Sequence, residues 1–205
     1  MIKNILFDMG NVVIRFDRGL IMDHAGVTDP ADRALLMREV FLSLEWARMD
    51  RGTVTDEEAV EIICRRVPER LHDAVRKIVT FWDRPIVEIP GVYELIEELK
   101  ENGYRIYLLS NASTRQPEYW QRVPAAKFFD GTLVSAFHKL IKPMPEIYEL
   151  MLKTFSLKAE ECFFIDDSAY NVDAASLCGI QGAVFFEDMT RLRGELRAAG
   201  VWVKA

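Results

Sequence analysis

The sequence predicts an α/β protein with a doubly wound parallel sheet and a helical cap domain inserted after the first strand. Three observations predict this fold. Short, continuous apolar runs end in polar residues, strand and helix patterns alternate from residue 90 onward, and residues 16–85 show helical spacing alone. Apolar runs of strand length that lack polar alternation are typical of strands buried on both faces of a parallel sheet. The predicted core domain therefore comprises residues 1–14 and 86–205, and the predicted cap domain comprises residues 15–85.

The first strand is expected over residues 2–8 and the cap helices follow it. The cap carries apolar stripes at helical spacing, namely Leu35, Leu36, Val40, Phe41 and Leu44, then Val60, Ile63 and Cys64, then Leu71, Val75, Ile78, Val79 and Trp82. Thr55 and Glu58 form a capping-box pattern ahead of the second stripe. These patterns predict a small helical bundle.

The remaining elements alternate in a regular order. Residues 90–103 predict a helix that Asn102-Gly103 ends. Strands are expected at residues 105–109, 131–136, 162–165 and 183–186, with helices at residues 145–155 and between the last two strands. Strand, helix, strand in this rhythm predicts βαβ units and, with the first strand, a parallel sheet of about five strands.

Composition excludes some functions. The chain has 205 residues, 28% of them charged, and its net charge of −6 argues against the basic face that nucleic-acid binding needs. No apolar run is long enough to span a membrane, and strand-like sequence begins too near Met1 to leave room for a signal peptide. The three cysteines lack metal-ligand spacing. We expect a cytoplasmic protein, monomeric or weakly dimeric, that binds neither nucleic acid nor membrane.

Carboxylates close two of the predicted strands. Ile5-Leu6-Phe7 leads into Asp8, and Cys162–Ile165 leads into Asp166-Asp167. The carboxyl ends of parallel strands lie at the edge of the sheet where open α/β folds bind ligands. Adjacent carboxylates repel one another unless a cation compensates them, and carboxylate oxygens suit Mg²⁺. The alternative is structural, because an aspartate after a strand can cap a turn or the next helix.

Three further polar residues are candidates for binding phosphate. Ser110 and Asn111 follow another apolar run, and their side chains and backbone N–H groups could bind phosphate oxygens. Lys142 precedes a helix and is a compact cation suited to phosphate. Each signal is weak alone, since loop Ser and Asn are common and most lysines are simply solvated.

Taken in order, these segments resemble the four motifs of the haloacid dehalogenase superfamily. The matching residues are Ile5–Asp8, Leu108–Asn111, Lys142-Pro143 and Phe163–Asp167, so the resemblance covers essentially the whole chain. It implies a Rossmann-like core with an inserted helical cap. It also implies Asp8 as a nucleophile that becomes an aspartyl-phosphate, with Lys142 neutralising the charge. The resemblance further implies that Mg²⁺ is bound by Asp8, the carbonyl of Gly10 and Asp167, with Asp166 either as a further ligand or as a residue that contacts the ligands. It also implies that the phosphate is bound by Ser110, Asn111 and Lys142.

One position departs from the phosphatase pattern of that superfamily. Gly10 stands where a second aspartate usually acts as general acid and base. The surrounding stretch resembles a bacterial sugar-phosphate phosphatase subgroup that includes enzymes acting on α-D-glucose 1-phosphate. The proton donor is left open among Asp17, Glu45, Asp50 and a bound water.

The sequence therefore predicts a Mg²⁺-dependent phosphomonoester hydrolase acting on a small phosphorylated metabolite, with a sugar 1-phosphate as one candidate. Two alternatives remain. A 2-haloacid dehalogenase uses no metal and also lacks the second aspartate, although Asp166-Asp167 would repel a haloacid carboxylate. A non-catalytic binding protein of the same fold is the other. Trp46, Arg48, Arg51 and Trp82 are candidate substrate contacts in the cap.

Overall fold

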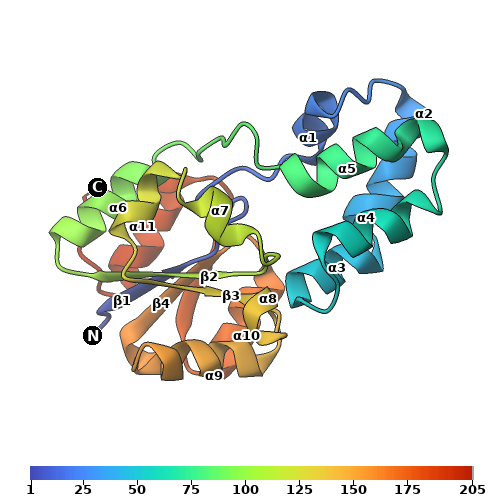
Figure 1. Cartoon of the computed structure of the whole chain (residues 1–205). Coiled ribbons are helices and arrows are strands. Elements are labelled where there is room, and N and C mark those ends of the chain that lie inside the picture. Colours follow the sequence, from blue (N-terminus) through green and yellow to red (C-terminus); the bar gives the residue numbers. More distant parts are fainter. Residues whose placement is uncertain (205) are drawn as a thin grey trace.

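A five-stranded parallel sheet forms the centre of the protein in the computed structural model, which describes residues 1–204. The strands are β1 (Asn4–Phe7), β2 (Arg105–Ser110), β3 (Gly131–Val134), β4 (Cys162–Asp166) and β5 (Gln181–Val184), in the order β3-β2-β1-β4-β5. Every neighbouring pair is parallel. The predicted fold class is confirmed (Figure 1).

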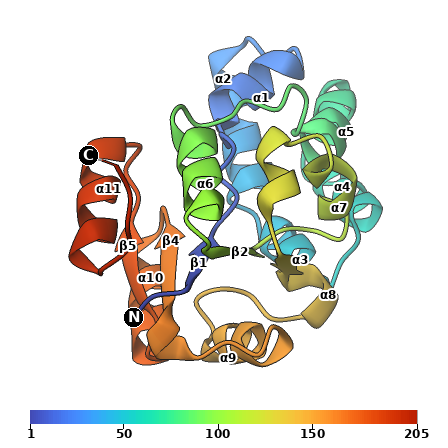
Figure 2. The same ribbon diagram turned by 90° about the vertical axis from the view of Figure 1, so that its left-hand side faces the viewer.

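Helices cover both faces of the sheet (Figures 1 and 2). Side chains alternate along β1: Ile5 and Phe7 enter one apolar cluster and Leu6 enters the other. The first cluster is covered by α6 (Val92–Glu101), α7 (Gln116–Trp120) and α11 (Met189–Ala198), and the second by α9 (Pro145–Thr154) and α10 (Ala169–Leu177). This two-sided burial explains why the strand sequences are continuously apolar.

The inserted segment is helical throughout. It contains α1 (Arg18–His24), α2 (Pro30–Leu36), a π-helical turn (Met37–Phe41), α3 (Leu44–Arg51), α4 (Asp56–Cys64), a 3₁₀ turn (Glu69–Leu71) and α5 (His72–Phe81). These helices share an apolar cluster of their own and stand to one side of the sheet in Figure 1. The capping box of Thr55 and Glu58 is formed at the start of α4. Leu44 differs from the predicted stripe, because it is 59% exposed while Val40 and Phe41 are buried.

Two strands, β3 and β5, end two residues before the ends that the sequence predicts. The third strand in the chain ends at Val134, and a short helix, α8 (Ser135–His138), begins where the apolar run continues. The last strand covers Gln181–Val184, because β5 pairs with β4 from Phe163 to Asp166 and pairing stops there. Phe186, assigned to that strand by its apolar character, lies beyond it and is 61% exposed.

The edge of the sheet formed by the carboxyl ends of its strands faces the helical segment. The chain leaves β1 at Asp8 to enter the helices and returns through residues 82–91 to begin α6. Gly10 and Glu88, one from each connection, form bridges to Ile14. Among the described residues, none of the helices has the length and apolar character needed to cross a lipid bilayer.

Candidate active site

Asp8 lies at the carboxyl end of the central strand. Its backbone N–H donates to the carbonyl of Ile165 over 2.9 Å, which extends the β1–β4 pairing by one residue. Because Phe7 pairs with Ile165, Asp8 and Asp166 emerge side by side. The pairing register thus brings together two carboxylates that are 158 residues apart in the chain.

Lys142 connects these two carboxylates. Its Nζ lies 2.8 Å from Oδ1 of Asp8 and 2.6 Å from Oδ2 of Asp166, and all three residues are buried. Burial alone would lower the pKa of Lys142, but the two carboxylates outweigh burial and raise it. The lysine therefore stays protonated. Its backbone is held by Asn111, which accepts from Lys142 N over 2.8 Å and donates to Lys142 O over 3.0 Å.

Asp166 has both carboxylate oxygens occupied. Oδ1 accepts from the backbone of Ser168 and from Asn171, and Oδ2 accepts from Asn171 and Lys142. A carboxylate with this many donors is fixed in orientation. Asp166 therefore acts on its surroundings mainly by holding Lys142 in place.

Asp167 completes a cluster of three carboxylates. Asp8, Asp166 and Asp167 each offer an oxygen within 4.8 Å of the others. Asp167 accepts from Nδ2 of Asn11 over 3.1 Å, and Asn11 adopts a left-handed φ of 55° while accepting from Phe16 N. Burial first, and then neighbouring carboxylates, raise the pKa of Asp167 and raise that of Asp8 to about 7. Three carboxyl groups thus gather around a single cation, Lys142, and the shifts disfavour ionising all three at once.

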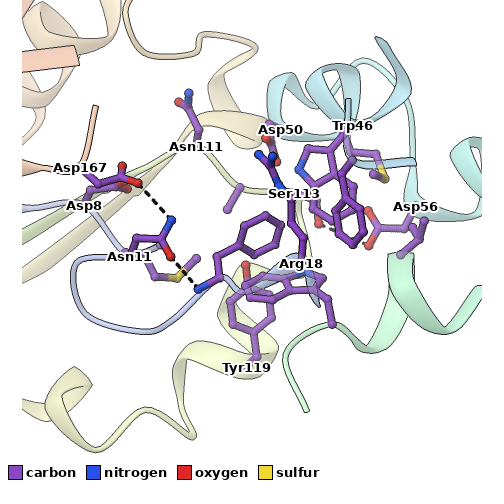
Figure 3. A pocket seen from close by; sticks show the side chains of 18 residues that line it. Asp8, Asn11, Arg18, Trp46, Asp50, Asp56, Asn111, Ser113, Tyr119 and Asp167 are labelled. Atoms are coloured by element: carbon purple, nitrogen blue, oxygen red, sulfur yellow. Dashed lines mark hydrogen bonds between the residues drawn. The ribbon is translucent and has the colours of Figure 1, made fainter. Parts of the chain in front are cut away.

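A cavity of about 350 Å³ opens next to this cluster, between the sheet edge and the helical segment (Figure 3). Asp8 and Asp167 lie at one end of it, and Gly10 also lines the cavity. The remaining lining side chains come mostly from the inserted segment and α7; they include Phe16, Arg18, Phe41, Trp46, Asp50, Asp56, Trp82, Ser113 and Tyr119. Several of these aromatic rings are in edge or tilted contact with one another.

Only some of the candidate residues named from the sequence line this cavity. Of Asp17, Glu45 and Asp50, only Asp50 lines this cavity. Trp46 and Trp82 line it as expected, whereas Arg48 and Arg51 do not. Ser110 ends β2 and is 1% exposed, and it is absent from the cavity wall although Asn111, which follows it, lines that wall.

Sequence reasoning missed several residues of the site. Asn171 was missed although it lies five residues after Asp166, a spacing that lets the first turn of α10 reach back to the strand end. Asp56 and Ser113, which are hydrogen-bonded to each other, were missed as well, together with Arg18 and Tyr119. Only the packing of helices against the sheet brings these four residues together, so no local pattern marks them.

The chain is similar in sequence to known phosphatases. A sesquiterpene phosphatase from Aspergillus oryzae is 26% identical over 185 residues, covering 88% of both chains. A phosphorylated carbohydrates phosphatase from Thermotoga maritima is 29% identical over 127 residues, which are 60% of this chain and 57% of that protein.

Solved structures share the fold. A HAD-family enzyme from Bacteroides thetaiotaomicron, in complex with magnesium and inorganic phosphate, is 27% identical with a TM-score of 0.72, covering 94% of this chain and 99% of that one. The L-2-haloacid dehalogenase from Xanthobacter autotrophicus superposes with a TM-score of 0.69 at 17% identity, covering 98% of this chain and 84% of that one. The family model for haloacid dehalogenase-like hydrolases matches residues 2–179, and the chain belongs to this family of hydrolases.

Proposed function

We propose that this hydrolase is a Mg²⁺-dependent phosphomonoesterase that acts on a small phosphorylated metabolite through an aspartyl-phosphate on Asp8. The observation that carries the proposal is the buried Lys142, which contacts Asp8 and Asp166 within a cluster of three carboxylates. A carboxylate nucleophile needs a nearby positive charge if it is to approach an anionic phosphoryl group. Lys142 supplies one such charge beside the attacking oxygen.

The donor set of the cluster fits Mg²⁺. Two oxygens bound to one Mg²⁺ lie at most about 4.2 Å apart, given metal–oxygen distances near 2.1 Å. The separations within the cluster, all under 4.8 Å, are close to this limit. Asp8 and Asp167 would be the carboxylate ligands, and the Gly10 carbonyl, which accepts no backbone hydrogen bond among the described residues, would be a third.

Asp166 is better suited to a supporting role than to direct ligation. Both of its oxygens already accept hydrogen bonds, and the residue has no exposed surface. Mg²⁺, when bound, would supply charge neutralisation and polarise the phosphoryl oxygens. We therefore assign metal binding to Asp8, Gly10 and Asp167, with Asp166 holding Lys142.

The phosphoryl group would be held by the end of β2 together with Lys142. The side chain of Asn111 is already hydrogen-bonded to the backbone of Lys142. Asn111 would therefore bind the phosphate through its backbone N–H. Ser110 is buried at the same strand end. The inserted helices, residues 15–85, would act as a cap domain that closes the cavity and selects the leaving group.

Two observations are compatible with the rival activity, dehalogenation of a 2-haloacid. Gly10 replaces the second aspartate, which haloacid dehalogenases also lack, and the fold is similar to that of an L-2-haloacid dehalogenase. Against it stands the composition of the cluster, in which three acidic side chains share a single lysine and would repel a haloacid carboxylate in the absence of a metal. Phosphatases that act on sesquiterpene and carbohydrate phosphates are among the relatives. A sugar 1-phosphate remains one candidate substrate within the wider class of small phosphate monoesters.

A screen of phosphorylated metabolites and of 2-chloropropionate, each with and without Mg²⁺, tests this proposal. We expect phosphate release that requires Mg²⁺ and is lost in Asp8→Asn, a nearly isosteric change. Chloride release in excess EDTA without any phosphatase activity would overturn the proposal in favour of dehalogenation. No turnover of either class would support a binding protein.

A further inference from the structure

The chain lacks a general acid at Gly10, so a leaving oxygen of high pKa gains most if another side chain of the cavity supplies its proton. In phosphoryl transfer the attacking and leaving oxygens lie roughly in line across the phosphorus. If Asp8 attacks from the sheet edge, the leaving oxygen points away from Asp8. A side chain that protonates this oxygen would therefore lie on the wall opposite Asp8.

Asp50 stands on that wall. It lies in the last turn of α3 and lines the same cavity as Asp8 and Asp167. Figure 3 shows it across the pocket from these two carboxylates. Among the described residues, no hydrogen bond engages the Asp50 carboxyl group, so it is free to serve a ligand.

The backbone of Asp50 is fixed to the core domain and not only to the other cap helices. The hydroxyl of Ser135 on α8 donates to the Asp50 carbonyl and accepts from Ala112 N, next to the end of β2. Arg51 donates through Nε to the carbonyl of Lys139 over 3.1 Å. Gly52 then approaches the backbone of Ala136 so closely that a β-carbon would overlap its carbonyl oxygen. These contacts hold Asp50 at a set position relative to the strand ends.

The surroundings of Asp50 favour its protonated form. Burial, and then the charges of Asp56 and Asp8, raise its pKa to about 7, while Lys142 opposes the shift. Asp56, Tyr119 on α7 and Arg18 are the other titratable or charged side chains of the inserted segment and α7 that line the same cavity. A carboxyl group that titrates near neutral pH is suited to give and take a proton.

The other acids of the cap are less suitable. Glu45 is paired with Arg66 over 2.5 Å, which lowers its pKa, and it does not line the cavity. Asp17 accepts from Leu20 N as the N-cap of α1. Asp56 does line the cavity, but it is held by Ser113 and lies at the far end from Asp8 in Figure 3.

We propose that Asp50 is the general acid and base of this enzyme, supplied by the cap in place of the aspartate missing at Gly10. This inference rests on the proposed phosphatase function. In the first step Asp8 bonds to phosphorus, the bond to the leaving oxygen breaks, and that oxygen keeps the electron pair and takes the proton of Asp50. In the second step Asp50 takes a proton from water, the water oxygen bonds to phosphorus, and the bond to Asp8 breaks, releasing phosphate and the Asp8 carboxylate.

The test compares wild type and Asp50→Asn on phosphate esters whose leaving groups range from 4-nitrophenol to glycerol. A positioned general acid contributes about 10²–10⁴-fold, and alcohols of high pKa need it most. We expect Asp50→Asn to lose about that factor in kcat/KM with glycerol phosphate and little with 4-nitrophenyl phosphate. The slope of log kcat/KM against leaving-group pKa should therefore steepen, and the fall in activity above about pH 7 should disappear. Asp50→Glu should restore part of the loss.

Matched variants make the result specific. Asp17→Asn keeps a capping side chain, and Glu45→Gln removes a cap carboxylate outside the cavity, so both should keep the wild-type slope. An equal loss by Asp50→Asn on all esters, or no loss, would overturn the inference, as would a steepened slope in Asp56→Asn alone. If Asp50→Asn does not fold, the dependence of log kcat/KM on leaving-group pKa in the wild type decides. A steep dependence would overturn the inference and a shallow one would support it. Absence of phosphatase activity in the wild type would overturn the proposed function and this inference together, whereas the outcomes above overturn the inference alone.

Discussion

The Nζ of Lys142 lies 2.6 Å from Oδ2 of Asp166, and both side chains are at most 1% exposed. Such a buried pair is costly to break, because the remaining partner keeps its charge without compensation. Here Lys142 serves Asp8 as well as Asp166, so removing the lysine would leave two unpaired carboxylates.

Lys142→Met should therefore lower the free energy of unfolding by about 3–5 kcal/mol at pH 7 in the absence of metal. The loss should shrink as the pH falls, because the orphaned carboxylates can then be protonated. Urea denaturation at pH 7 and pH 5 measures both effects. Lys3→Met is a matched control: its pair with Glu161 is exposed, so it should cost no more than about 1 kcal/mol.

Gly52 provides a test of how the inserted helices are joined to the elements around the sheet. Gly52 and Gly26 both adopt left-handed backbone, with φ of 72° and 80°, but only Gly52 lies against another backbone segment. Gly26→Ala should cost about 1 kcal/mol for the conformation alone. Gly52→Ala should cost about 2–4 kcal/mol, because the overlap with Ala136 adds to that strain.

Gly52→Ala should also reduce kcat, since α3 carries Asp50. Thermal unfolding and steady-state kinetics on both variants separate the two costs. Equal effects of the two substitutions would mean that the contact between α3 and α8 is unimportant for stability and for activity.

Asp50 should make stability depend on pH. Its carboxyl group has a pKa raised from the usual 3.8 to about 7 by burial and by Asp56 and Asp8. Between these values the folded protein keeps a proton that the unfolded chain has released, so rising pH lowers stability through this range. The full shift corresponds to about 4 kcal/mol, and solvent reaching the half-buried side chain reduces the effect.

Asp50→Asn should accordingly stabilise the protein by roughly 1–3 kcal/mol at pH 8 and hardly at all at pH 4. Denaturant unfolding at the two pH values, without metal, gives this difference. The exposed Asp17→Asn is the comparison and should change stability little at either pH. A constant difference between Asp50→Asn and wild type across this range would show that Asp50 releases its proton as freely in the folded protein as in the unfolded chain.

Asp167 should be required for metal binding but not for folding. Asp167→Asn retains an oxygen that can accept from Asn11 and removes one charge from a crowded cluster. We expect Mg²⁺ or Mn²⁺ binding, measured by calorimetry, to weaken at least tenfold while the fold is unchanged. Asp173→Asn, which removes an exposed acid from α10, should bind metal like the wild type. Unchanged metal affinity in Asp167→Asn would show that the metal binds at other residues.

Sequence reasoning reached the sheet and its edge because both depend on local patterns. Each strand is marked by an apolar run, and Asp8 and Asp166-Asp167 each end one, so parallel pairing alone brings them together. The start of α8 at Ser135 was not predictable from such patterns. Pairing with β2 stops at Val134, and the hydroxyl of the next residue, Ser135, bonds to residues from two other segments, Ala112 and Asp50.

The cavity wall was the least predictable part of the site. Asp50, Glu45 and Asp17 are alike in sequence, since each is an acid near a helix start or end. Only the packing of α3 on α8 distinguishes Asp50, which lines the cavity, from Glu45, which pairs with Arg66. Tertiary contacts of this kind leave no periodic signal in the chain.

The central claim is that Asp8 carries the phosphoryl group, and trapping the intermediate tests it most directly. Enzyme turning over 4-nitrophenyl phosphate with Mg²⁺ would be quenched in acid, digested and analysed by mass spectrometry. We predict one added phosphoryl group on the peptide that contains Asp8, and none in Asp8→Asn or in the absence of Mg²⁺. Turnover at the wild-type rate by Asp8→Asn, or a phosphoryl group found on another residue, would contradict the account.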